Sequence, residues 1–239
     1  GARGILPLKG KNSFTLAEVL ITLGIIGIVA ALTLPTLVQH HRKQVVETRL
    51  MKFYSSINQA VKMAELDYGD KKDWYNDYAE PMYDKYGKEV QGKTPKEKWF
   101  NKYLRPYLKI LKVESSEMTL DIYFPDGGMF RLDPNYPTDY AYHPTLPQGC
   151  REARGYCVFS FNFKPDDKTN PHLYNKGVEP YYWLDASLKW EDMADEVRTI
   201  KDYCYGIQNA PGTDSRMYCT AVIQQNGWKI PDDYPYKVR

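Results

Sequence analysis

The hydrophobic pattern divides the chain into one long apolar run and a polar, aromatic remainder. Residues 14–38 read FTLAEVLITLGIIGIVAALTLPTLV and contain one charged side chain, Glu18. A helix of 25 residues is about 38 Å long, whereas the hydrocarbon core of a bilayer is about 30 Å thick. The run therefore predicts a membrane-inserted helix that carries a soluble head.

Beyond Gln39 the apolar residues return at three- and four-residue steps, which is the period of an amphipathic helix. They are Val46, Leu50, Phe53, Ile57, Ala60 and Ala64. No strong helix breaker precedes Asp67, so one helix is expected from Phe14 to about Leu66, roughly 80 Å long. A heptad coiled coil is the competing interpretation of the second half.

The remainder mixes strand and helix signals, which favours an α+β head. MTLDIYF and MFRLD flank the turn Pro125–Gly128 and predict a hairpin over 118–133. Thr94 followed by Pro95 predicts a helix start, and Pro106 is expected to divide that helix. The pattern also predicts strands over 156–163 and 181–185. It predicts helices over 74–78, 189–203 and 217–226, and Gly227 is expected to cap the last of these.

The composition excludes one class of function and leaves others open. The net charge of +2 lacks the basic excess of a dedicated nucleic-acid binder, so no nucleic-acid partner is expected. The 21 Tyr, 8 Phe and 5 Trp can fill a core that has few aliphatic residues, or they can present amphipathic patches to a ligand.

The four cysteines, Cys150, Cys157, Cys204 and Cys219, all lie in the second half of the chain, beyond the apolar run. An even number in an exported domain indicates two disulfides. Of the three connectivities that can be drawn, we favour Cys150–Cys157 and Cys204–Cys219, because each would close a local loop. Free buried thiols are the alternative. No CxxC spacing is present, which argues against zinc or thioredoxin-like chemistry.

The residues of the apolar run that are charged, small or helix-breaking indicate most about its function. A carboxylate at mid-bilayer costs about 2.5–3.5 kcal/mol, so Glu18 is expected either near the membrane interface or paired with a positive charge from another molecule. Gly24 and Gly27 give the helix small faces that allow close helix packing. Pro35 lacks an N–H group and predicts a kink.

SFTLAEVLITLGIIGIVAALTLPTL resembles the N-terminal signature of type IV pilins and type II secretion pseudopilins. The resemblance implies a pilin-like fold, in which a long N-terminal helix packs on a small antiparallel sheet. It implies cleavage by a prepilin peptidase between Ser13 and Phe14, N-methylation of Phe14, and a docking role for Glu18 during filament assembly. Pro35 matches the late proline of these helices. The family usually carries Gly before the cut, where this chain has Ser13.

The resemblance also implies partners and a location. The partners are other pilin or pseudopilin subunits, the prepilin peptidase, the inner-membrane assembly platform and the membrane itself. The subunit is expected to be single-pass in the bacterial inner membrane, with its head extracytoplasmic, and to enter a surface or periplasmic filament. Arg3, Lys9 and Lys11 favour a cytoplasmic N-terminus, whereas the cluster His40–Lys43 opposes that orientation.

Four segments are therefore expected: a leader over 1–13, a membrane and filament-core helix over 14–38, an amphipathic half over 39–66 and a head over 67–239. No G-x-S-x-G, H-E-x-x-H, P-loop or G-x-G-x-x-G motif occurs, so an enzyme is not expected. No cofactor is expected either. Asp166, Asp167 and Asn170 offer oxygen atoms for Ca²⁺, but their spacing fits a polar turn better than an EF-hand.

Two other functions compete with a filament subunit. One is a monomeric, membrane-tethered protein whose aromatic head binds a ligand, for example a glycan. The other is a competence pilin that takes part in DNA uptake.

Overall fold

The computed structural model describes residues 15–78, 81–132, 138–146, 150, 154–182, 196–209 and 214–239. It divides into two compact units, Gly1–His41 and Arg42–Arg239. The first helix, α1, covers Leu16–Tyr68 in 53 residues, which confirms the single long helix expected from the pattern. The second unit contains the second half of α1 in addition to the expected head over 67–239, and this whole unit is called the head from here on.

Within the head, the second half of α1 supplies one wall of the core. Its buried residues repeat at helical spacing: Val46, Glu47, Leu50, Phe53, Ile57, Ala60, Val61 and Ala64. They face the sheet, where the Phe53 ring lies 5.1 Å from the rings of Phe130 and Phe161. The amphipathic pattern is therefore satisfied by the sheet of the same chain.

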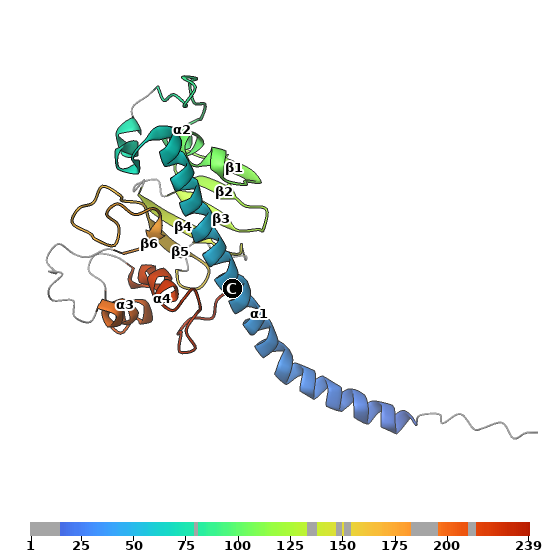
Figure 1. The fold of residues 1–239 in the computed structure, drawn as a ribbon. Coiled ribbons are helices and arrows are strands. Elements are labelled where there is room, and N and C mark those ends of the chain that lie inside the picture. The colour runs from blue at the N-terminus through green and yellow to red at the C-terminus, as the bar shows by residue number, and fades with distance from the viewer. Residues whose placement is uncertain are drawn as a thin grey trace, which may run out of the picture. The chain divides into compact units, whose positions relative to one another are not determined.

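The sheet is an antiparallel meander of six strands in chain order, β1-β2-β3-β4-β5-β6. Figure 1 shows α1 crossing it, with α3 and α4 beyond β5 and β6. The strands are β1 Lys112–Ser115, β2 Leu120–Tyr123, β3 Met129–Leu132, β4 Asp139–His143, β5 Phe159–Asn162 and β6 Glu179–Pro180.

The β2–β3 hairpin forms where the sequence predicts it. Phe124 and Gly128 close the turn through the Phe124 N–H and the Gly128 carbonyl, and Gly127 adopts a φ of 84° that L-residues rarely take. The Asp126 carboxylate accepts the Gly128 N–H and also pairs with Lys52 of α1 at 2.8 Å. Asp126 thus connects the hairpin turn to the helix that covers the sheet.

Aromatic residues fill the space between α1 and the short helices that follow it. These helices are η1 Lys71–Tyr78, α2 Pro95–Tyr103 and η2 Arg105–Tyr107. Trp74 stacks on Tyr103 with ring centroids 4.5 Å apart, and Trp99 packs beside both rings. The abundant aromatics are thus largely core residues in the described part of the chain.

Helix α2 begins as the sequence predicts. The Thr94 hydroxyl accepts the Glu97 N–H at 3.1 Å, and the Glu97 carboxylate accepts the Lys93 N–H at 2.9 Å. The Thr94 hydroxyl therefore caps the first helical turn, and the Glu97 side chain reaches back past the N-cap residue to the N–H of Lys93.

A second, smaller core lies between α3 Glu196–Tyr205, η4 Ser215–Tyr218 and α4 Cys219–Gln225. The Cys204–Cys219 disulfide joins α3 to α4, and Cys150–Cys157 closes the loop before β5. These are the two local pairings that the spacing favours.

One strand of the predicted sheet needs correction, and two further strands have no clear signal in the sequence. The strand expected over 181–185 is instead β6, two residues earlier, and residues 183–185 lie outside the described part. Pro180 can end an edge strand because it has no N–H to donate. Strands β1 and β4 were not predicted. The start of the helix expected over 189–203 also lies outside the described residues, and α3 extends to Tyr205.

Candidate functional site

The first unit presents an apolar helix surface. Thirteen large hydrophobic side chains between Leu16 and Val38 are 41–78% exposed. They are Leu16, Val19, Leu20, Ile21, Leu23, Ile25, Ile26, Ile28, Val29, Leu32, Leu34, Leu37 and Val38. Among the described residues, α1 is the one helix that is long and apolar enough to cross a membrane. Such a surface needs lipid or other apolar helices around it.

Glu18 lies in the first turn of α1, where it caps its own helix. Its carboxylate accepts the Thr15 N–H and the Thr15 hydroxyl, both at 2.8 Å. The Thr15 hydroxyl oxygen accepts the Glu18 N–H in return, at 3.3 Å. The pair is a capping box, and the T-x-x-E spacing in the sequence is the signal from which it could have been predicted.

Two other threonine hydroxyls of the apolar half are satisfied locally. The Thr22 hydroxyl donates to the carbonyls of Glu18 and Val19, and the Thr33 hydroxyl donates to that of Val29. Buried hydroxyls without partners are costly in lipid, and this back-bonding removes the cost.

The small residues and the proline lie within the continuous helix. A Cβ added at Gly24 or Gly27 would meet no atom within 4 Å, so the helix surface is uncovered at both positions. Pro35 lies inside α1 and does not end it. The expected cleavage and methylation residues, Ser13 and Phe14, lie outside the described residues.

The suggested calcium ligands form a turn. The Asp167 carboxylate accepts the Thr169 N–H and hydroxyl, at 3.0 and 2.6 Å. Asn170 is buried, and its side chain donates to the Tyr182 carbonyl and accepts the His172 N–H. Asp166 is exposed. Within the described residues, no three His, Cys, Asp or Glu side chains are grouped in a way that could hold a metal ion.

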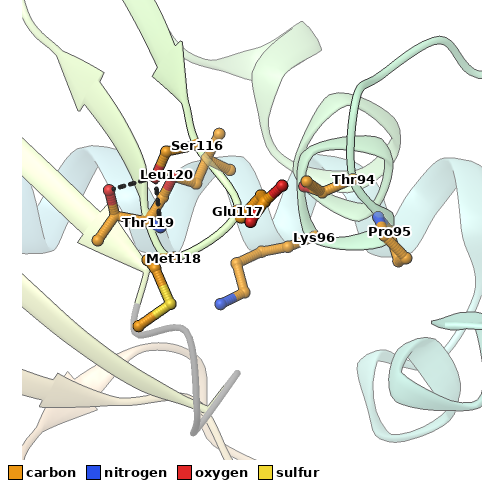
Figure 2. A pocket seen from close by; sticks show the side chains of 8 residues that line it. All are labelled: Thr94, Pro95, Lys96, Ser116, Glu117, Met118, Thr119 and Leu120. Atoms are coloured by element: carbon orange, nitrogen blue, oxygen red, sulfur yellow. Dashed lines mark hydrogen bonds between the residues drawn. The ribbon is translucent and has the colours of Figure 1, made fainter.

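Two shallow grooves occur on the head. The first, of about 390 Å³, lies between the start of α2 and the β1–β2 turn, and Figure 2 shows Lys96 reaching across it from α2 toward the turn. Its Ser116 hydroxyl is bonded to Thr119, and its lining also contains Lys96 and Glu117. The second groove, of about 340 Å³, is lined by Tyr68, Tyr86 and Tyr107 among others. Neither groove could be predicted from the sequence, because each is formed by segments distant along the chain.

Comparison with known families gives two matches, one to the apolar run and one to the rest of the chain. Residues 8–34 match the prokaryotic N-terminal methylation motif, and residues 36–238 match a family described as "Family of unknown function (DUF6613)". A search of curated proteins and a search of solved structures each found no match.

The methylation motif, the exposed apolar half of α1 and the helix-on-sheet head together define a type IV pilin-like protein, in the class that includes the pseudopilins. Such a family indicates a structural protein rather than an enzyme. The family match covers most of the chain, which therefore belongs to the family of unknown function DUF6613.

Proposed function

We propose that this chain is a structural subunit of a type IV pilus or a type II secretion pseudopilus. The observation that carries the proposal is the apolar surface from Leu16 to Val38, which begins with a single acid and is followed by a head with its own core. Burying each Leu, Ile or Val side chain is favourable by about 1.5–3 kcal/mol. Lipid supplies that environment before assembly, and like helices supply it afterwards.

The proposed life of the subunit has three steps. The apolar helix anchors it in the inner membrane with the head outside. A prepilin peptidase then cuts between Ser13 and Phe14, and the new amino group of Phe14 is methylated. An assembly platform finally moves the helix from lipid into a bundle of identical helices. The positive charges of His40–Lys43 argue against placing the head outside. One of them, Lys43, forms an ion pair with Asp232 at 3.1 Å, which supports the proposed orientation because it reduces that opposing charge.

Glu18 is proposed to change partners during assembly. In the single chain its carboxylate is held by Thr15. In the bundle, the Phe14 amino group of a neighbour would be a stronger partner, because an ion pair compensates a buried charge that a neutral hydroxyl leaves uncompensated. The capping box keeps the acid satisfied until that neighbour arrives.

Glu18→Ala and Thr15→Val test this exchange. Glu18→Ala should insert into the membrane but fail to enter filaments. Thr15→Val is the matched control, since it removes the hydroxyl contact and keeps the acid, so it should assemble. The measurement is the amount of subunit in sheared filaments relative to the membrane fraction. Normal incorporation of Glu18→Ala would exclude the docking role.

Processing can be tested independently by N-terminal sequencing and mass spectrometry of native protein. The expected N-terminus is a methylated Phe14. A native protein that retains residues 1–13 would contradict the filament proposal and favour the membrane-tethered binding protein instead.

A further inference from the structure

Residues 229–239, called the strap here, run across the head and contact segments that are far apart in the sequence. Ile230 and Val238 are buried in the main core, near the two ends of the strap. Between them, Asp233 accepts hydrogen bonds from Lys201 and Tyr205 of α3. The strap is therefore fixed by side chains from several elements and contains no helix or strand of its own.

One end of the strap closes over α1 at Glu47. This side chain is 6% exposed, and both of its described partners belong to the strap. Its carboxylate accepts the Ile230 N–H at 2.9 Å and the Lys229 ammonium at 3.0 Å. A buried carboxylate requires such partners, so the seated strap is what allows Glu47 to lie inside the head.

The other end of the strap rests on the two disulfide-closed loops. The Tyr236 hydroxyl donates to the Cys204 carbonyl at 2.6 Å, and the Tyr234 hydroxyl donates to the Gly155 carbonyl at 2.8 Å. The Arg239 N–H donates to the Tyr156 carbonyl at 3.1 Å. All three acceptors lie at or within a cystine loop.

The packing at Gly155 brings the strap and both cystines together. An added Cβ there would lie 3.0 Å from the Tyr236 ring and 3.3 Å from the Cys219 sulfur. Gly155 also has a φ of 77°, which disfavours any other residue. The seat for Tyr236 therefore depends on where both disulfides hold their loops.

The strap leaves α4 through a strained hinge. Gly227 and Trp228 both have positive φ, 66° and 62°, and this conformation is unusual for a residue as large as Trp. Trp228 is held there by its N–H bond to the Ile223 carbonyl and by packing on Tyr54, with ring centroids 4.8 Å apart.

We propose that the strap is a latch whose docking depends on the disulfides of the head: it binds to Glu47 of α1 only after both disulfides have formed. Closure joins two thiol sulfurs, and their two protons and two electrons pass to a disulfide oxidant, which becomes a dithiol. A subunit with open loops keeps its sheet but presents a released strap and a hydrated Glu47. This inference does not depend on the proposed filament role.

Hydrogen exchange on the full-length chain in detergent micelles tests the latch. In Cys204→Ser/Cys219→Ser, the Ile230 and Arg239 amides should exchange at least about tenfold faster, while the β2 and β3 amides change by less than about twofold. Cys150→Ser/Cys157→Ser should behave similarly, because Gly155 and Tyr156 also support the strap. Tyr236→Phe should reproduce part of the effect with both disulfides intact.

Lys237→Gln is the matched control within the strap, because Lys237 is exposed and has no described hydrogen bond or ion pair, so it should not alter exchange at Ile230. Two results would overturn the proposal. Unchanged strap protection without the disulfides would mean that the strap seats independently of them. An equal rise in strap and sheet exchange would mean that the head opens as one unit and has no separate latch.

Discussion

Phe53 of α1 stacks on Tyr142 of β4, with ring centroids 4.1 Å apart and planes 9° from parallel. This contact joins the helix to the middle of the sheet, and Phe53 is 4% exposed. Phe53→Ala should lower the free energy of unfolding by about 3–5 kcal/mol, because it removes the ring and leaves a cavity. Denaturant unfolding would measure it. Met51→Ala, at a 49% exposed position on the same helix, should cost far less.

A close backbone approach at Gly177 supports a second prediction. The Asn58 side chain bonds both the N–H and the carbonyl of Val178, each at 2.8 Å, and a Cβ at Gly177 would collide with the Asn58 amide oxygen. Gly177→Ala should therefore destabilise the head by about 1–3 kcal/mol.

A double-mutant cycle would show whether the collision is the cause. In an Asn58→Ala background the added methyl group has room, so Gly177→Ala should then cost much less. Equal costs in both backgrounds would contradict the close-approach explanation.

His143 makes the head sensitive to mild acid. Burial lowers its pKa from 6.5 to about 4, with a further lowering from the Arg131 guanidinium. The folded state therefore keeps His143 neutral while the unfolded chain binds a proton below 6.5. Stability should fall as the pH drops from about 6.5 to about 4, by up to roughly 3 kcal/mol.

His143→Gln should flatten this part of the pH profile, because Gln does not titrate. Stability of the two proteins at pH 7 and pH 4.5, measured by urea unfolding, provides the comparison. A pH dependence that survives in His143→Gln would show that another group causes it.

Glu179 should act in the opposite direction. Burial raises the pKa of this carboxyl above 4.5, although the Tyr54 hydroxyl donates to both of its oxygens. The contribution of the neutral acid is present at low pH and is lost as the pH rises through the raised pKa. At pH 8 the free energy of unfolding of Glu179→Gln should equal that of the native protein or exceed it by up to about 1 kcal/mol. Thermal unfolding at pH 8 and pH 5 would test whether this advantage shrinks on acidification.

The parts of the fold that follow from local signals could be predicted from the sequence. The period of Val46–Ala64 defines the buried face of α1, Thr94 and Pro95 mark the start of α2, and Pro125–Gly128 marks the hairpin turn. Strand β1 is an edge strand with alternating exposure, so its sequence KVES resembles a loop. Strand β4 could not be predicted from its own residues, because it is defined by its pairing with β3 and β5.

For the candidate site, the sequence indicates candidate residues but not their contacts. Glu18 was singled out because it is the only charge in an apolar run, whereas its bond to Thr15 required attention to the T-x-x-E spacing. The role of Glu47 could not be predicted, because both of its described partners are more than 180 residues away along the chain. A charged position in an amphipathic pattern normally indicates solvent.

The chain-order meander has a consequence for how the head is built during synthesis. Each described strand pairs with the one synthesised just before it, so the sheet can grow one hairpin at a time as the polypeptide emerges. Topologies dominated by such short-range pairings fold faster and expose unpaired edges for less time. Residues 229–239 emerge after all of these strands, when the sheet against which they pack is already paired.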